Sequence, residues 1–173
     1  MLIRRERPTD HAAVREVHRS AFASPDGSPA AEPVEVRLTD RLREDPGFLP
    51  HLSLVAVVDG GVVGHVLATR GWLEPFGTAA LGLGPLGVHA AHQRHGIGTS
   101  LVHALLAVAE ACDERVVALL GSPDYYRRFG FRAAADLGIE APDPQWGEHF
   151  QARVLTGGAV EGRFRYAEPF DRL

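Results

Sequence analysis

Residues 96–112 have apolar side chains around almost the whole circumference of a helix. The apolar positions are Ile97, Leu101, Leu105, Val108 and Cys112 on one face, with Val102, Leu106 and Ala109 beside them. A helix of this kind must be buried against other elements. Aliphatic strands are predicted on both sides of it, over 79–88 and 115–120, and such strands typically form a parallel pair covered on both faces. This unit constrains the chain to an α/β architecture.

The rest of the chain extends this unit into one mixed sheet flanked by helices. The other predicted strands cover residues 2–6, 52–58, 62–69, 151–155 and 162–166, and further helices cover 10–22, 33–44 and a short stretch after Pro123. Asp59-Gly60-Gly61 is a hairpin signal between two of the strands. Loops are expected over 23–33, 70–78 and 135–148. We expect a single domain over residues 1–173, because this length is typical of one domain and no repeat or linker divides it.

The composition excludes several classes of enzyme. All 18 basic residues are arginine, so Schiff-base enzymes, pyridoxal phosphate enzymes and P-loops with a lysine are excluded. The formal net charge of -4 does not favour nucleic acid as a partner. The single cysteine, Cys112, excludes a zinc site built on paired cysteines and is predicted to be an inert thiol in the core.

Neither a membrane span nor a secretion signal is predicted. The longest apolar runs are strand-sized, far below the roughly 20 residues that a membrane span needs. The first eight residues are charged and lack the apolar core of a secretion signal. We therefore expect a cytoplasmic protein.

An anion site is predicted where a strand ends near Val88 and a helix begins near Gly96. The N–H groups of a helix start have no partner within the helix, and the helix dipole adds partial positive charge. Glycine at 96 and 98 lets a ligand approach the backbone closely, and Arg94 and His95 add local positive charge. These features indicate a pyrophosphate cradle. The alternative is an ordinary helix start with glycines for tight packing.

A second glycine pattern lies just upstream. Residues 82–87 match G-x-G-x-x-G, but the dinucleotide fingerprint needs these glycines between a strand and a helix. Here they lie inside a predicted strand, so we do not expect a dinucleotide site. Pro85 and the glycines instead predict a bulge that leaves backbone groups free for a ligand.

Two motifs in register resemble the GNAT superfamily of N-acetyltransferases. Its acyl-CoA motif, Q/R-x-x-G-x-G/A, stands here as Gln93, Gly96 and Gly98, and its Y-x-x-x-G-F element begins at Tyr126. One helix and one strand separate them, as in the family. Residues 121–131, G-S-P-D-Y-Y-R-R-F-G-F, resemble the corresponding segment of a bacterial subgroup of predicted N-acetyltransferases. The resemblance is clearest over about 50–132 and weakest at the N-terminal helices and over 135–173.

The resemblance implies acetyl-CoA as the co-substrate and assigns roles to particular residues. The cradle that would hold the CoA pyrophosphate comprises Gln93, Arg94, His95, Gly96, Ile97, Gly98 and Thr99. The strand backbone at Leu86, Gly87 and Val88 would pair with the pantetheine arm. Tyr126 would lie near the thioester sulfur, and a tyrosine with a pKa near 10 can protonate the leaving thiolate. The alternative for Tyr126 is a half-buried aromatic that packs the short helix.

The sequence constrains the identity of the general base less than that of the CoA-binding residues. Glu35 lies on the predicted helix over 33–44, in a region that lines the acceptor site in such folds. Other candidates are Glu32, Glu74, His65 and His89, although His65 in its apolar strand is typical of a core histidine. His89, His92 and His95 are spaced by three but lie in a loop without an E-x-x-H pair, so no metal is expected.

We therefore predict an N-acetyltransferase that moves an acetyl group directly from acetyl-CoA to an amine. The alternative is a non-catalytic acyl-CoA-binding sensor or partner-binding domain. A protein terminus, a lysine side chain, an antibiotic amine and a polyamine all stay open as acceptors. The acceptor would be recognised by the segments 23–33, 33–44, 70–78 and 135–150. The pattern does not determine the oligomeric state, and a homodimer stays open.

Overall fold

The computed structural model describes residues 1–23 and 32–172. The strands are β1 (Leu2–Arg5), β2 (Phe48–Val58), β3 (Gly61–Glu74), β4 (Thr78–Val88), β5 (Val116–Leu120), β6 (Arg132–Ala133), β7 (Ile139–Glu140), β8 (Phe150–Val154) and β9 (Gly162–Arg165). The α-helices are α1 (His11–Ala21), α2 (Val34–Glu44), α3 (Ile97–Ala111) and α4 (Pro123–Tyr126), and short 3-10 turns lie between these elements. The predicted α/β class is confirmed.

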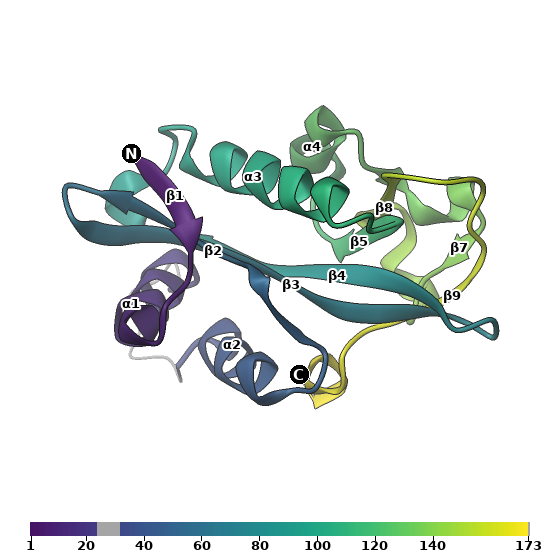
Figure 1. Cartoon of the computed structure of the whole chain (residues 1–173), viewed down its shortest axis with the longest axis horizontal. Helices are drawn as coiled ribbons and strands as arrows, with labels where there is room; N and C mark the ends of the chain where they lie inside the picture. The colour runs from purple at the N-terminus through teal and green to yellow at the C-terminus, as the bar shows by residue number, and fades with distance from the viewer. Residues whose placement is uncertain (24–31, 173) are drawn as a thin grey trace.

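The described strands form one mixed sheet between two layers of helices. Its main order is β1-β2-β3-β4-β5-β8-β6, and β9 pairs with β3 and β7. Figure 1 shows α1 and α2 on one face of the sheet and α3 and α4 on the other. β4 and β5 are the parallel pair that α3 connects, as predicted, and β1 to β4 are antiparallel neighbours.

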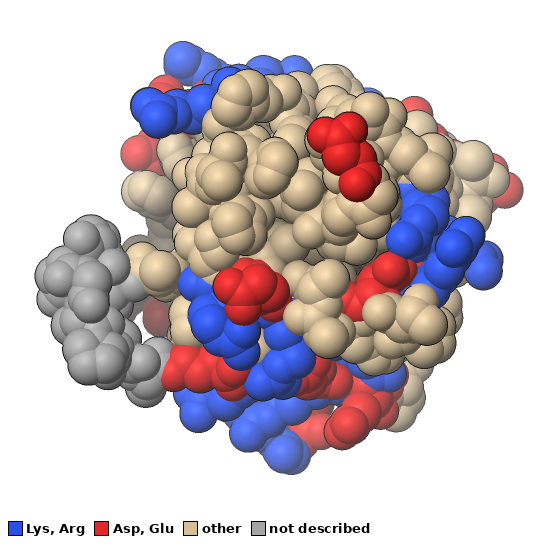
Figure 2. Space-filling model, turned by 90° about the vertical axis from the view of Figure 1, so that its left-hand side faces the viewer, with Lys and Arg blue, Asp and Glu red and all other residues tan. Residues whose placement is uncertain are grey.

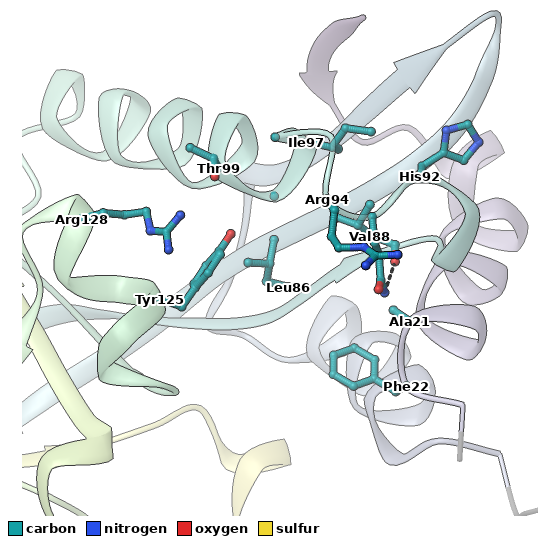
Figure 3. A pocket seen from close by; sticks show the side chains of 13 residues that line it. Ala21, Phe22, Leu86, Val88, His92, Arg94, Ile97, Thr99, Tyr125 and Arg128 are labelled. Atoms are coloured by element: carbon teal, nitrogen blue, oxygen red, sulfur yellow. Dashed lines mark hydrogen bonds between the residues drawn. The ribbon is translucent and has the colours of Figure 1, made fainter. Parts of the chain in front are cut away.

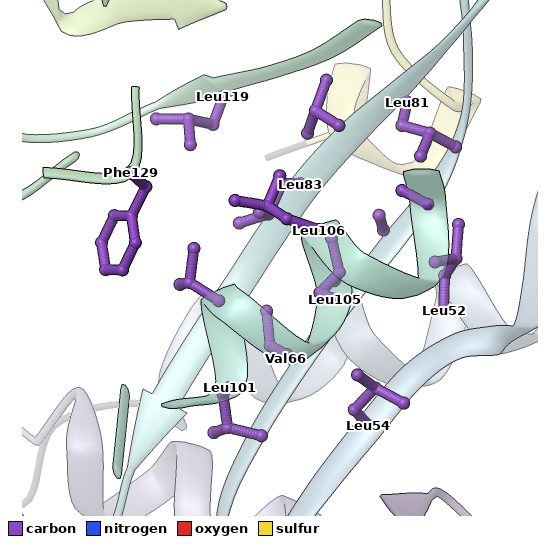
Figure 4. Packing of buried hydrophobic residues seen from close by; sticks show 14 of the residues in the cluster. Leu52, Leu54, Val66, Leu81, Leu83, Leu101, Leu105, Leu106, Leu119 and Phe129 are labelled. Atoms are coloured by element: carbon purple, nitrogen blue, oxygen red, sulfur yellow. The ribbon is translucent and has the colours of Figure 1, made fainter. Parts of the chain in front are cut away.

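The main core lies between α3 and the sheet. Figure 4 shows the leucines of α3 pointing at leucines of β2 and β4 and at Leu119 of β5. The buried members on α3 are Ile97, Leu101, Val102, Leu105, Leu106 and Ala109. The sheet beneath α3 therefore holds the start of that helix in a fixed place beside the end of β4.

Two expectations from the sequence are wrong. Residues 70–78 are not a loop, because β3 continues to Glu74 and β4 already begins at Thr78. Trp72 pairs there with Ala79 of β4 and with Arg165 of β9, so a strand from the far end of the chain extends the hairpin. Cys112 is exposed rather than buried, because α3 ends at Ala111 and the cysteine caps it beyond the packed turns.

The terminal strands are confirmed as β8 and β9. The segment over 135–148 holds short 3-10 turns and the two-residue strand β7. The predicted loop over 23–33 lies largely outside the described residues. None of the described helices has the length and apolar character that a membrane span needs.

Arginines of α1 and α2 form ion pairs with acids of these helices and of the segments before them. Arg15 contacts both Glu32 and Asp40, and Arg43 contacts Asp40 and Glu6. Figure 2 shows basic and acidic side chains interleaved over the lower part of one face, at the height where Figure 1 places these helices. Many of the carboxylates of this layer are therefore neutralised by an arginine.

A chain of buried polar groups joins α1 to β1, β2 and β3. The Ser53 hydroxyl donates to Glu6 at 2.6 Å, His65 Nε2 lies 3.0 Å from the Ser53 oxygen, and His18 Nε2 lies 2.8 Å from His65 Nδ1. Because the only hydroxyl proton of Ser53 points to Glu6, His65 Nε2–H must donate to Ser53, and His18 Nε2–H must donate to His65. The lone pair of His18 Nδ1 is left buried without a partner in the described part of the chain.

This polar chain packs directly under β4. A Cβ atom at Gly87 would lie 2.7 Å from His18 Nδ1, so the absence of a side chain at Gly87 makes room for the imidazole. Burial lowers the pKa of His18 to about 2, with help from His65 and Arg43. Burial also lowers the pKa of His65 and outweighs the opposite effect of Glu6. Both rings are therefore neutral in the folded protein.

The two buried histidines predict a loss of stability toward acid. An unfolded histidine takes up a proton near pH 6.5, whereas the folded rings resist protonation. Their contribution is complete above that pH and falls by about 1.4 kcal/mol per pH unit for each ring below it. Urea unfolding at pH 7.5 and pH 5.0 measures this fall. His18→Gln keeps a donor for His65 and should reduce the slope by about half, whereas the exposed control His149→Gln should not. An unchanged slope in His18→Gln would contradict the assignment.

Candidate functional site

The site begins where β4 and β5 separate. In the described residues they pair at two positions, Leu81 with Val117 and Gly82 with Ala118. β4 then continues to Val88, whereas β5 ends at Leu120. The edge of β4 beyond Gly82 is therefore open on the side that faces β5.

The pairing with β3 determines which backbone groups face this open edge. The His89 N–H donates to the Val63 carbonyl at 2.9 Å, and the same register continues back along β4. Residues of an antiparallel ladder alternate in the neighbour that they face, so Gly87 directs its N–H and C=O toward β3. Those of Leu86 and Val88 point to the open edge. Two of the three predicted strand residues thus present backbone groups there, and Gly87 makes room for His18 instead.

The predicted bulge in β4 is confirmed. Ala68 pairs with Leu83 and Val66 with Leu86, so Gly84 and Pro85 stand opposite a single residue of β3. Gly84 has φ +145, a backbone conformation that glycine adopts without strain. All the glycines of the G-x-G-x-x-G pattern lie inside β4, so the strand-to-helix arrangement of a dinucleotide site is absent from these residues.

The predicted cradle lies at the start of α3. Gly96 caps the helix with φ +78, and the first helical bond runs from Ser100 N–H to the Gly96 carbonyl at 2.9 Å. Within the described chain, no backbone carbonyl outside the helix accepts from the N–H groups of residues 94–99. The N–H groups of Ile97, Gly98 and Thr99 in the first helical turn therefore point out of the helix start, where a negatively charged oxygen would be stabilised.

A pocket of about 490 Å³, the cradle pocket, lies in front of these N–H groups. It is lined by Ala21, Phe22, Leu86, Val88, His92, Gln93, Arg94, Gly96, Ile97, Gly98, Thr99, Tyr125 and Arg128. Gln93 Nε2 donates to the Val88 carbonyl at 3.0 Å and so ties the loop to the end of β4, which Figure 3 shows as a dashed line. Of the predicted ligand-binding residues, Gly87 and His95 do not line this pocket. Arg94 and Arg128 supply its positive charge.

The sequence did not single out Tyr125 as part of this pocket. Figure 3 shows its ring pointing toward Thr99 at the start of α3, with Arg128 beside it. A Cβ at Gly98 would lie 2.8 Å from the Tyr125 hydroxyl, so the tyrosine packs closely over that glycine. Partial burial raises the pKa of Tyr125, and the nearby Thr99 and Arg128 oppose the increase.

Tyr126 faces a different space. Its ring packs against Gly121, just beyond the end of β5, and is nearly perpendicular to that of Tyr125. Burial raises the pKa of Tyr126 above its ordinary value, and Tyr125 adds to the increase. The hydroxyl has no hydrogen-bond partner among the residues described. It is therefore protonated at neutral pH and free to donate to a ligand.

Tyr126 lines a second space of about 570 Å³, the aromatic cavity. Its lining residues are Phe22, Glu35, Leu38, Leu83, Gly84, Pro85, Leu86, Leu120, Tyr126, Pro142, Asp143, Trp146, Tyr166, Phe170 and Asp171. Phe22 and Leu86 line the cradle pocket as well, so the two spaces adjoin at β4. The β4 bulge and the irregular segment after β7 both contribute to the cavity, as the sequence suggested for that segment.

Among the candidate bases, Glu35 lines the aromatic cavity with Tyr126. Glu32 is paired with Arg15 and Arg19, and Glu74 with Arg165. His65 is fully buried in the polar chain described above.

The histidine loop does not bring metal ligands together. The His89 Nδ1 accepts from the Ala91 N–H, and the rings of His89 and His92 stand edge to face at 6.0 Å. In the described part of the chain, no group of three or more His, Cys, Asp or Glu side chains is placed to hold a metal.

Comparison with known proteins places this geometry in context. The model of the acetyltransferase (GNAT) family matches residues 12–131. The uncharacterised N-acetyltransferase YhbS of Escherichia coli (strain K12) is 33% identical over 177 residues, covering 100% of each chain. The crystal structure of the Escherichia coli YhbS in complex with CoA has a TM-score of 0.86 at 31% identity, covering 99% of this chain and 92% of that one. A GNAT family acetyltransferase from Brucella melitensis in complex with acetyl-CoA has a TM-score of 0.79 at 33% identity, covering 98% and 97%.

Proposed function

The chain belongs to the GNAT family of acetyltransferases, and we propose that it transfers the acetyl group of acetyl-CoA directly to an amine bound in the aromatic cavity. The observation that supports this most strongly is the continuity of two unlike spaces along β4. One presents free N–H groups and arginines, and the other presents Tyr126 and Glu35. The relatives from Escherichia coli and Brucella melitensis bind CoA and acetyl-CoA, respectively.

In this proposal the cradle pocket holds the CoA part of the donor. The pyrophosphate accepts hydrogen bonds from the N–H groups of residues 94–99, and Arg94 and Arg128 lie beside it. The pantetheine arm runs along the open edge of β4 and pairs with the backbone of Leu86 and Val88 as an added strand would. The thioester then lies where the two spaces adjoin, next to Leu86.

The chemistry needs a neutral amine, a polarised carbonyl and a protonated leaving group. The amine nitrogen attacks the thioester carbon, and a backbone N–H at the open edge stabilises the negative oxygen that forms. When this oxyanion re-forms the carbonyl, the C–S bond breaks, and the thiolate takes the proton of the Tyr126 hydroxyl. Glu35 receives the proton that the amine loses, and exchange with water restores both residues. The cytoplasmic location stays a prediction, and the oligomeric state stays open.

Gly98→Val tests the cradle. The new side chain would collide with the Tyr125 hydroxyl and narrow the pocket in front of the N–H groups. Acetyl-CoA at 100 times its Kd should stabilise the parent by about 2.7 kcal/mol, and the variant should lose most of this gain. Thermal unfolding with and without acetyl-CoA measures it.

The matched control is Gly158→Val, since no atom of the described residues lies within 4 Å of a Cβ at Gly158. It should keep the full stabilisation by acetyl-CoA. Equal stabilisation of parent and folded Gly98→Val would show that the ligand binds elsewhere.

Tyr126→Phe tests the proton donor. The hydroxyl has no hydrogen-bond partner to lose among the described residues and the ring keeps its packing, so the fold should survive. General acid catalysis contributes about 10²–10⁴-fold, and kcat should fall by that factor with little change in acetyl-CoA affinity. A CoA-thiol release assay measures the change.

Tyr125→Phe is the control for this test, because its hydroxyl lies in the cradle pocket. It should weaken acetyl-CoA binding modestly and leave kcat nearly unchanged. A near-parental kcat for Tyr126→Phe, or a larger loss for Tyr125→Phe, would mean that the thiolate is protonated in another way.

A further inference from the structure

We propose that the acceptor is an aliphatic amine with at least two amino groups, one acetylated and the other held as an ammonium ion in the aromatic cavity. This inference rests on the proposed function. It starts from the charge of the cavity lining. Three carboxylates line it, those of Glu35, Asp143 and Asp171, and no arginine or histidine does so among the described residues.

The three carboxylates come from separate segments and lack cationic partners. Glu35 lies on α2, Asp143 precedes the 3-10 turn Pro144–His149, and Asp171 lies in the turn Glu168–Arg172. None of them forms an ion pair with any described residue, although the neighbouring Arg172 pairs with Glu168. Three carboxylates on one lining, with no arginine or histidine among the described lining residues, favour a cationic ligand.

The reaction itself determines how many positive charges this ligand needs. The attacking nitrogen must be neutral, so it leaves no positive charge for the carboxylates at the moment of transfer. Glu35 receives the proton of that nitrogen, which leaves Asp143 and Asp171 negative and unpaired. A second amino group further along the acceptor is protonated at neutral pH and supplies the missing charge. A monoamine cannot be the neutral attacking group and also supply this positive charge.

The rest of the lining fits an aliphatic chain between two nitrogens. Trp146, Phe170 and Tyr166 present aromatic rings, against which methylene groups pack and an ammonium ion is attracted by the ring faces. Tyr166 is 6% exposed, and its hydroxyl has no hydrogen-bond partner among the described residues. That oxygen is available to accept from an ammonium N–H. The cavity volume of about 570 Å³ is that of a small-molecule site.

The same lining disfavours acceptors with a negative group. A carboxylate or phosphate would face three like charges on the lining, without an arginine or histidine among the described lining residues to neutralise it. Amino acids and nucleotide-like amines should therefore be poor acceptors, and salt should weaken the binding of a diamine by screening its attraction.

Three compounds of matched length test the inference. 1,4-Diaminobutane, butylamine and 4-aminobutanoate share a primary amine and differ in whether the far end is an ammonium, a methyl group or a carboxylate. We expect kcat/KM to fall by about tenfold or more from the diamine to butylamine and again from butylamine to 4-aminobutanoate. A tenfold change corresponds to about 1.4 kcal/mol. The KM for the diamine should rise with ionic strength. Equal kcat/KM for diamine and butylamine would overturn the inference and leave the proposed function intact.

Substitution of two acidic residues, with one control, tests which side chains bind the second ammonium group. The double variant Asp143→Asn, Asp171→Asn should raise the KM for the diamine about tenfold, as expected for two partly screened ion pairs, with an unchanged KM for acetyl-CoA. Asn at 143 keeps the oxygen that accepts from the Gln145 N–H, so the turn should stay folded. Asp113→Asn is the control, because Asp113 is exposed and does not line the cavity. An unchanged KM in the double variant would overturn the inference.

Calorimetry separates this inference from the proposed function. With CoA bound, 1,4-diaminobutane should bind at least tenfold more tightly than butylamine, whether or not acetyl transfer follows. Binding of the diamine without release of CoA from acetyl-CoA would contradict the proposed function, and the acceptor role with it, but would leave the preference of the cavity for a second ammonium ion intact. Absence of diamine binding would contradict the inference alone if butylamine is still acetylated.

Discussion

The separation of β4 from β5 is the constraint on which the rest of the site depends. After two registered pairs the strands diverge, and a sheet edge that would ordinarily be paired is left open inside the molecule. Buried backbone groups need hydrogen-bond partners, so this edge stays stable only because a ligand or water can reach it. The separation persists because β5 pairs with β8 on its other side, while the core under α3 holds β4 against β3.

The two spaces beside this open edge of β4 also differ in the sign of their charge. The cradle pocket has arginines and free N–H groups, and the aromatic cavity has carboxylates, so Leu86 marks a boundary between positive and negative surroundings. With the diamine acceptor that we infer, each substrate meets the charge opposite to its own, and the bonds that form and break lie at the boundary. Because the chain has no lysine, the protein's own side chains offer no primary amine that could compete as acceptor.

Local pattern predicted the part of the fold and site that depends on local sequence. The helix α3, its start at Gly96 and the hairpin at Asp59 could be predicted because each is determined by neighbours along the chain. β3 was underestimated because its last residues are held by β9, which lies some ninety positions away. Cys112 was misplaced because periodicity does not show where the packing of a helix ends. Tyr125 and His18 were missed because their partners, Gly98 and Gly87, are close only in the folded protein.

The contact between His18 and Gly87 has a consequence for how sequences of this kind can diverge. The imidazole fills the volume that a side chain at 87 would need, and its other nitrogen is bound into the chain that ends at Glu6. Adding one carbon at position 87 would push α1 from the sheet, and with it Phe22, which lines both spaces. The two positions therefore form a single packing unit. Relatives that change one of these residues should also change the other. Such covariation would link α1 to the open edge of β4.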